Sequence, residues 1–419
     1  MEKCNPIKIL TIGLIVYIFL LFISPYRYPI YDYIALGYLI LCFLCLYVGM
    51  IFIYIIFYLK TKNNFIKKRP IHIYQISKFH KKMIIFIFMV STIFFLYLSL
   101  KMVSKIGTNN LFEASYSDLM AENTSLEKVA QIFLKVPVAV YILLMWSDIK
   151  RFKVLNCFVN ISLWYYSVLM LIAGRRGEFI STLILFLFIQ YLKGSLKKIR
   201  LKKVIKSLPI IVIIIILFSL VNTLFKNRGL YGALDLYFLI PNDIVVKPWA
   251  KALYNLDANV FDSLYKMLFY YTHSVPWFTY NFNHINYSMV WHGKITFYII
   301  SYFLSPFGYN FPKIGEMIKI QEHYGLYNTF VSNFLMDFGK IGTLFFIFFF
   351  GMVIMLIYVF SYKYSLFKYY MPVTCLILFV STIYPISIGG TDFLLLFITV
   401  LYFLFRIEIR RGVLIWKKY

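Results

Sequence analysis

Arg175 and Arg176 stand side by side between two glycines, and Glu178 follows them. They separate two apolar runs, 154–172 and 179–192, each long enough, or nearly so, to cross a bilayer as a helix. An arginine so close to lipid is costly unless it faces water, a cavity or an anion. The stretch therefore predicts either a phosphate-binding tip between two helices or a hairpin end whose arginines extend to lipid headgroups.

A third arginine, Arg228, also stands beside a glycine where an apolar run ends. The planar guanidinium group binds phosphate oxygens in pairs, so several arginines together suit a diphosphate. We predict that Arg175, Arg176 and Arg228 bind the diphosphate of a lipid-linked substrate. The alternative is that they pair with Glu178 or with lipid headgroups.

Aromatic rings alternate with amide, hydroxyl and imidazole groups in the segment 270–284. Flat rings stack on the C–H faces of sugars and polar groups bind sugar hydroxyls, so Trp277, Tyr280 and His284 are candidate sugar-binding residues. An aromatic belt at the membrane surface explains the same rings, but it explains His273 and His284 less well. His273 is a candidate base, with a structural hydrogen-bonding role as the alternative.

Acidic side chains near the expected membrane surface are candidates for proton transfer. Asp337 lies just before an apolar run, where burial would favour its action as a general base. The alternative is that it caps the following helix or pairs with Lys340. Glu178 is a further candidate acid, and Asn328 is a candidate sugar-binding amide.

Composition identifies the class of protein. The chain has 419 residues, of which 61% are hydrophobic, and its mean hydropathy is +0.76. Soluble domains are far less apolar. The sequence therefore predicts an all-α polytopic membrane protein that forms a single integral membrane domain over 1–419.

Ten apolar runs predict about ten transmembrane helices. They are 9–23, 34–59, 83–103, 129–146, 154–172, 179–192, 208–224, 341–360, 371–386 and 393–405. One long loop, 225–340, remains between the seventh and eighth runs. It is rich in aromatic residues and contains a short apolar piece, 295–304, which is predicted to be an amphipathic or re-entrant helix.

The net charge of +26 is explained by topology. Most of the Lys and Arg fall in stretches that share one side of the membrane with both termini, and such stretches are cytoplasmic by the positive-inside rule. The tip at 174–178 and the loop 225–340 then face the opposite, extracytoplasmic side. Because the positive charge follows the topology so closely, we expect no nucleic-acid partner.

A family resemblance rests on these same motifs. The tip at 174–178, followed after a long external loop by 327–330, 337–339 and Gly342, resembles the O-antigen polymerase (Wzy) family. Members of that family polymerise bacterial oligosaccharide repeat units and have a glycosyltransferase-C-like membrane fold. The family pattern of an arginine, ten residues and a glycine is absent at Arg175 and Arg228.

The resemblance implies a reaction. The growing glycan would move from undecaprenyl diphosphate to the non-reducing end of a new undecaprenyl-diphosphate-linked repeat unit, to build O-antigen, capsule or a related surface polysaccharide. Arg175, Arg176 and Arg228 would hold the diphosphate leaving group. The family motif best supports Asp337 as the base.

The external stretches contain no Asp-x-Asp pair of the kind that holds a divalent ion. We therefore expect a metal-independent reaction without a cofactor, in which arginine charge replaces the ion. The expected location is the bacterial plasma membrane, in contact with membrane lipids, and binding of a chain-length regulator stays open. A ligase that transfers finished glycan, or a flippase of lipid-linked oligosaccharide, is the alternative function.

Overall fold

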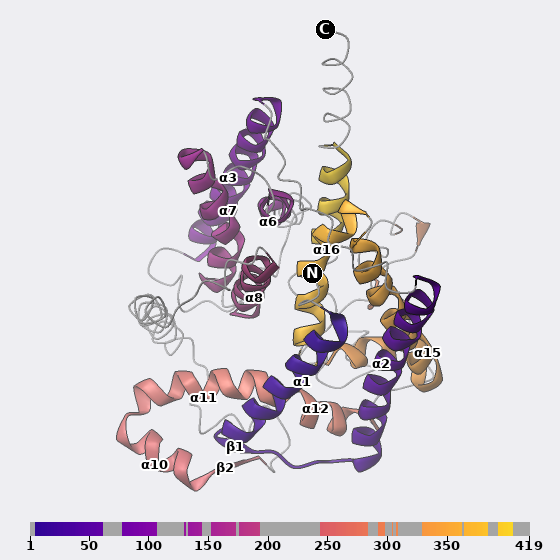
Figure 1. The fold of residues 1–419 in the computed structure, drawn as a ribbon. Helices are drawn as coiled ribbons and strands as arrows, with labels where there is room; N and C mark the ends of the chain where they lie inside the picture. Colours follow the sequence, from indigo (N-terminus) through magenta and orange to yellow (C-terminus); the bar gives the residue numbers. More distant parts are fainter. Residues whose placement is uncertain are drawn as a thin grey trace, which may run out of the picture. The chain divides into compact units, whose positions relative to one another are not determined.

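The computed structural model describes helices and their connections in two compact units (Figure 1). The described residues are 5–61, 78–106, 130, 133–144, 152–172, 176–192, 244–283, 292–297, 304, 307–308, 329–362, 364–383 and 393–404. Unit 1 contains Met1–Phe65, Pro209–Phe360 and Thr374–Ile388, and unit 2 contains Ile66–Leu208, Ser361–Val373 and Gly389–Tyr419.

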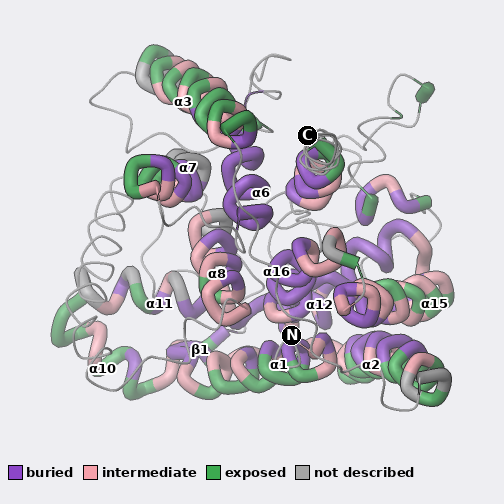
Figure 2. The backbone as a smooth tube through the Cα atoms, turned by 45° about the horizontal axis from the view of Figure 1, so that its top comes forward, coloured by how far each residue is buried: buried purple, intermediate pink, exposed green. Residues whose placement is uncertain are grey.

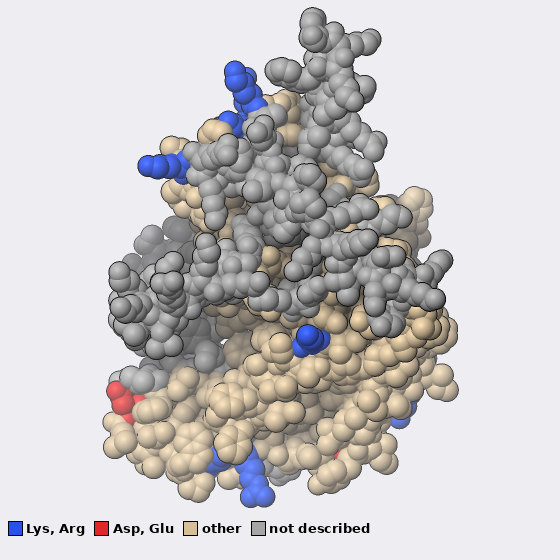
Figure 3. Space-filling view, viewed as in Figure 1, with Lys and Arg blue, Asp and Glu red and all other residues tan. Residues whose placement is uncertain are grey.

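The chain is a helical membrane protein, as its composition predicts. Four helices in the described ranges are long and apolar enough to cross a membrane, namely Pro6–Ile23, Tyr33–Phe57, Lys78–Lys101 and Phe330–Ser361. Shorter apolar helices cover Phe179–Leu192, Leu366–Val380 and Phe393–Leu404. Figure 3 shows that the described surface on one face is mostly uncharged, which suits contact with lipid.

Several predicted runs correspond to helices, with shifts of up to about five residues at their ends, except that α16 (Ser365–Val380) begins and ends six residues before the predicted run 371–386. These are α1 (Pro6–Ile23), α2 (Tyr33–Thr61), α3 (Lys78–Ile106), α7 (Lys153–Ile172), α8 (Arg176–Leu192) and α16. The predicted run 208–224 lies outside the described residues. The prediction for 341–360 placed the helix start too late, because α15 (Phe330–Ser361) begins before the apolar run.

Two further differences concern the connection between 225 and 340. Of the expected helix 295–304, residues 295–297 form turns and 304 is helical, while 298–303 lie outside the described residues. A two-residue antiparallel ladder, which the all-α prediction did not include, joins β1 (Tyr26–Arg27) to β2 (Val245–Val246). Backbone pairing over so short a length depends on tertiary contact, and no alternating pattern in the sequence predicts it.

The pairing of β1 with β2 attaches the long connection 225–340 to the segment between α1 and α2. β1 lies between α1 and α2, and Figure 1 shows β2 beside it, immediately before α10 (Pro248–Leu256). Lys247 reinforces the joint, because its backbone N–H donates to the Pro25 carbonyl at 2.8 Å and its Nζ donates to the Phe22 carbonyl at 3.2 Å. The second bond satisfies a carbonyl at the end of α1 that no intrahelical donor reaches.

An aromatic core supports the helices that follow, α10, α11 (Ala258–Thr272) and α12 (Ser274–Asn281). Its buried members are Tyr26, Ile244, Ala250, Tyr265, Phe269 and Trp277. The Tyr265 hydroxyl donates to the Ala250 carbonyl at 2.9 Å, so the ring's one polar atom is satisfied inside the cluster. This core lies outside the long apolar helices and gives the connection its own packed interior.

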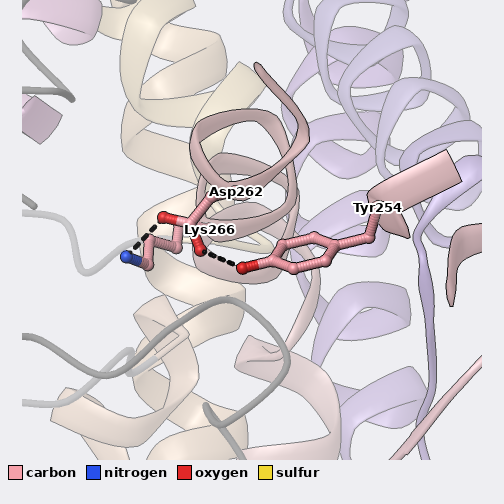
Figure 4. Close-up of polar contacts among 3 residues, drawn as sticks. All are labelled: Tyr254, Asp262 and Lys266. Carbon is pink, nitrogen blue, oxygen red and sulfur yellow. Dashed lines mark hydrogen bonds and ion pairs between the residues drawn. The ribbon is translucent and has the colours of Figure 1, made fainter. Parts of the chain in front are cut away.

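A polar clasp joins α10 to α11 (Figure 4). The Asp262 carboxylate accepts a hydrogen bond from the Tyr254 hydroxyl at 3.2 Å and pairs with Lys266 Nζ at 2.6 Å. Asp262 is buried, so both of its oxygens need such partners.

We expect Tyr254→Phe to lower the free energy of unfolding by about 1 kcal/mol, since it removes one hydrogen bond to a buried carboxylate. The measurement is thermal melting of the purified protein in detergent. Tyr33→Phe is the matched control, because Tyr33 is exposed and its hydroxyl faces away from the core. Equal melting temperatures for wild type and Tyr254→Phe would show that the hydrogen bond from Tyr254 to Asp262 does not stabilise the protein.

Helices α2 and α15 cross at two glycines. A Cβ added to Gly49 would collide with the Phe348 carbonyl oxygen, and one added to Gly351 would collide with the Leu46 carbonyl oxygen. Each glycine therefore faces the backbone of the opposite helix. Small residues at such crossings are what permit close helix packing in membranes, where packing and hydrogen bonds hold helices together.

In unit 2, α7 and α8 form an antiparallel pair on either side of the predicted tip. The Ser167 hydroxyl donates to Thr182 Oγ1 at 2.6 Å across the pair. Gln190 Nε2 donates to the Tyr141 hydroxyl at 3.1 Å, which joins α8 to α6 (Val136–Leu143). All residues of α6 are buried (Figure 2), so this short helix is the centre of the unit.

Candidate functional site

A break in α15 lies beside a group of buried polar residues in unit 1. Gly339 has φ 65° and ψ −175°, a conformation that is open almost only to glycine. Thr343 stabilises the restart of the helix by donating from its hydroxyl to the Gly339 carbonyl at 2.6 Å. Asp337 lies two residues before the break, within the first part of α15 (Phe330–Phe338), which we call the arm. The alternative prediction, that Asp337 caps the start of a helix, is therefore wrong.

The Asp337 side chain is completely buried and fully engaged. Its carboxylate accepts hydrogen bonds from the backbone N–H groups of Ile295 at 3.1 Å and Thr296 at 2.5 Å. Its own carbonyl accepts from the N–H of His292 at 3.0 Å. Asp337 thus anchors the turn 292–297 to the first part of α15. The backbone N–H groups of the turn replace the water molecules that a carboxylate loses when it is buried.

The turn presents two ionisable side chains that the sequence did not single out. His292 is exposed and has φ 50°, and Gly293 after it has φ 86°. Lys294 is half-buried. Non-glycine residues with positive φ are uncommon and are often found where the surrounding structure holds them for a purpose. Here the hydrogen bonds to Asp337 hold the backbone of the turn 292–297 in this conformation.

The end of α12 packs against the same break. The Tyr38 hydroxyl donates to the Lys340 carbonyl at 2.7 Å, and the Tyr38 ring lies 5.1 Å from the Phe282 ring between centroids. Lys340 Nζ stands 4.5 Å above the centre of the Phe282 ring, within the range of a cation–π contact. Lys340 therefore faces an aromatic ring and the start of α2.

A second carboxylate completes the group. The Asp32 carboxylate accepts from Asn283 Nδ2 at 2.6 Å and from the Ile34 N–H at 2.7 Å. Desolvation raises the pKa of Asp32, but these bonds, one from the Ala35 N–H and the charge of Lys340 outweigh it, so the pKa is lowered. Asp32 therefore stays ionised at neutral pH.

We call this group the kink site. It comprises Asp32 and Tyr38 at the start of α2, Asn281, Phe282 and Asn283 at the end of α12, the turn 292–297, and Asp337–Lys340. It combines carboxylates, cations, an imidazole and amides where α2 and the apolar part of α15 begin. Such a set can bind a polar, hydroxyl-rich ligand and move a proton.

His273 is buried and makes the kind of hydrogen bond that its structural alternative predicts. It is fully buried, its ring stacks on Phe269 with centroids 4.5 Å apart, and its Nδ1 lies 2.5 Å from the Phe269 carbonyl oxygen. The carbonyl can only accept, so the neutral ring carries its proton on Nδ1. Burial lowers the pKa of His273 to about 3, against a smaller opposing effect of the Phe269 bond.

This burial predicts a loss of stability in acid. Above pH 6.5 His273 is neutral in both the folded and the unfolded chain, so it contributes nothing. Below pH 6.5 the unfolded chain takes up a proton that the folded chain refuses until about pH 3. The free energy of unfolding should therefore fall by about 2 kcal/mol between pH 7 and pH 5 from this one group.

The measurement is melting in detergent from pH 7 to pH 5, with His273→Gln as the comparison because glutamine does not titrate. The variant should have a flatter pH dependence, whatever its stability at pH 7. Parallel curves for the two proteins would show that folding does not lower the pKa of His273.

Trp277 and Tyr280 lie on the same side of α12, one helical turn apart, but differ in exposure. Trp277 is 1% exposed and belongs to the aromatic core, so protein side chains occupy the surroundings of its ring. Tyr280 is half-buried, stacks on Trp277 at 5.4 Å and meets Tyr31 edge-on at 5.3 Å. Of the two predicted sugar-binding rings, only Tyr280 has a surface left to offer.

The remaining predicted residues are placed in part or not at all. α8 begins at Arg176, which puts Arg176 and Glu178 in the first turn of that helix. The description does not extend to their side chains. Arg175, Arg228, His284 and Asn328 lie outside the described residues.

Sequence reasoning missed Asp32, Asn281, His292 and Lys294 as members of a site. Asp32 and Asn283 are far apart in the chain, and no motif joins them. A usable signal was present at His292, because a histidine before a glycine at a turn is compatible with positive φ.

Comparisons with protein-family models, with curated proteins and with solved structures find no match for this chain.

Proposed function

We propose that this protein is a membrane glycosyltransferase that polymerises undecaprenyl-diphosphate-linked oligosaccharide repeat units in the bacterial plasma membrane. The proposal includes about ten spans, both termini in the cytoplasm, and the kink site and the 174–178 tip on the extracytoplasmic side. The growing glycan leaves its lipid diphosphate and joins the non-reducing end of a new lipid-linked repeat unit.

The observation that carries the proposal is the kink site. A buried carboxylate, a second carboxylate, two lysines and amide groups gather where apolar helices of membrane-spanning length begin. A substrate with a polar glycan and a lipid tail needs this combination. A flippase instead needs polar groups along a path through the spans.

Asp337 is the proposed base. The acceptor hydroxyl oxygen forms a bond to the anomeric carbon while the bond from that carbon to the phosphate oxygen breaks. The diphosphate departs with the bonding electron pair, and the hydroxyl proton moves to the base. Asp337 is the fully buried carboxylate of the kink site, and exclusion of water favours transfer to a sugar over hydrolysis.

The diphosphate is assigned to Arg175, Arg176 and Arg228. Arg176 is the first residue of α8, so an arginine and the N–H groups of a helix's first turn, which have no intrahelical partner, belong to the same short segment. Both features attract phosphate, and no metal ion is needed for charge neutralisation when they act together.

The first test is deletion of the gene. We expect the surface glycan to carry a single repeat unit in place of a ladder. Purified protein in lipid vesicles should convert lipid-linked repeat units into a ladder, also in the presence of EDTA. An unchanged chain-length distribution in the deletion strain would overturn the proposal, and long glycan retained on the lipid carrier would indicate a ligase.

Arginine variants test the assigned diphosphate contacts. Arg175→Ala and Arg176→Ala should each reduce ladder formation by about a hundredfold to a thousandfold at equal membrane abundance, the loss expected for one charge-assisted contact to a leaving group. Arg27→Ala is the matched control, because Arg27 is an exposed arginine on β1. Equal effects of all three variants would mean that the tip has no special role.

A further inference from the structure

Asn281 is a buried amide without a hydrogen-bond partner in the described part of the chain. The residue is 2% exposed, and both its Oδ1 and its Nδ2 are unpartnered. A buried polar group in this state is costly, and native structures keep very few of them. A side chain with an unmet donor and an unmet acceptor therefore suggests a ligand.

The residues close to Asn281 at the end of α12 make contacts of their own. Asn283 donates to Asp32, and the Thr279 hydroxyl donates to the Pro276 carbonyl at 2.7 Å. Phe282 packs between Tyr38 and Lys340. The end of α12 is thus held in place by other contacts, and Asn281 is not needed to hold it.

The face of α12 that carries Asn281 has a second unmet group at its other end. Ser274 lies two helical turns before Asn281, on the same face, and its hydroxyl donates to the Thr382 carbonyl at 2.8 Å. The Thr382 side chain is 3% exposed, and its hydroxyl has no hydrogen-bond partner among the described residues. Ser274 and Asn281 are about 10 Å apart along the helix, so Thr382 lies beside the end of α12 opposite to Asn281.

The chemistry of this face selects a neutral ligand. An amide offers one acceptor and two donors, and a threonine hydroxyl offers both functions. Between them lie the buried Phe278 and Trp277, which carry no charge. Adjacent hydroxyls of a sugar match an amide's donor and acceptor, whereas the residues named on this face of α12 offer no positive charge to a diphosphate.

We propose that the Asn281 amide binds two hydroxyls of the glycan, with Thr382 binding a hydroxyl further along the same glycan. The inference rests on the proposed function, because it assigns the sugar contact within that reaction. Asn281 holds the glycan in register and is a positioning residue, since it does not touch the reacting atoms.

The test compares stability with binding. If the amide has no structural partner, Asn281→Leu should melt at the same temperature as wild type or higher, because it removes an unsatisfied polar group. It should also reduce ladder formation by about tenfold or more, since a lost pair of hydrogen bonds to a substrate has an effect of that size. Thr382→Val should show the same combination with a smaller loss.

Thr279→Val is the matched control on the opposite face of α12. It removes a satisfied hydroxyl, so its melting temperature should fall while ladder formation per folded protein is unchanged. A lower melting temperature for Asn281→Leu would overturn the inference, because it would show that the amide makes structural bonds. Full ladder formation by Asn281→Leu would also overturn it and would leave a bound water as the occupant.

Binding separates this inference from the proposed function. The probe is the water-soluble oligosaccharide released by mild acid from the lipid-linked repeat unit that accumulates in the deletion strain. It should raise the melting temperature of wild type and of Thr279→Val but not that of Asn281→Leu. If wild type forms no ladder yet shows this shift, the polymerase proposal fails and the sugar site stands; equal shifts in all three proteins would remove the sugar site alone.

Discussion

Asp337→Asn should destabilise the protein and abolish ladder formation. The asparagine side chain has one acceptor oxygen where the carboxylate has two, so the N–H groups of Ile295 and Thr296 would compete for it. One buried donor would be left unmet, at a cost of about 1–3 kcal/mol in the free energy of unfolding. Asp337→Leu leaves both unmet and should cost more.

The activity of Asp337→Asn should fall further than its stability explains. Loss of a general base costs about a hundredfold to ten-thousandfold in rate, which folded but inactive protein would reveal. The measurements are melting in detergent and ladder formation per folded protein. Thr343→Val is the control, because it weakens the kink by removing the bond to the Gly339 carbonyl while the carboxylate stays.

Two results for Asp337 would change its assigned role. If Asp337→Asn loses stability but each folded molecule keeps wild-type activity, the residue only anchors the turn 292–297, and Asp32 becomes the base to test. If Asp337→Asn melts like wild type, the hydrogen bonds to the turn are not important for stability.

The sequence was sufficient to predict the helices whose formation depends on local composition. Continuous apolar runs gave α1, α2, α3, α7 and α8 close to their observed bounds, because a helix that contacts lipid must be apolar along its length. It was insufficient for α15, whose first part is a buried arm with Asp337 and other polar residues. Burial in protein permits such residues where contact with lipid would not.

The candidate site was predictable only in part for the same reason. Asp337 was identified from its position before an apolar run, and the structure adds that its partners are backbone amides. The bond between Tyr38 and the Lys340 carbonyl joins residues 302 positions apart, and no local pattern contains that information. A tryptophan in this segment is compatible with an aromatic belt, a sugar site or a buried core. Only the packing around Trp277 distinguishes among these three.

Substitutions that force α2 and α15 apart where they cross should have the largest effect on folding. In Gly49→Ala and Gly351→Ala, the new methyl group would meet the Phe348 or the Leu46 carbonyl oxygen, and backbone atoms cannot rotate away. Each change should cost about 1–3 kcal/mol as an overpacked contact. The double variant should fail to accumulate as folded protein, because both helices would have to separate.

Gly37→Ala provides the control on the same helix. No atom lies within 4 Å of a Cβ added at Gly37, and alanine is the better helix former by about 1 kcal/mol, so this variant should melt at or above the wild-type temperature. The measurement is the fraction of monodisperse protein after detergent extraction, followed by its melting temperature. If Gly49→Ala and Gly351→Ala behave like Gly37→Ala, α2 and α15 do not cross at these glycines. The kink site would then lose its frame, because its residues at the start of α2 and at the break of α15 are brought together by that crossing.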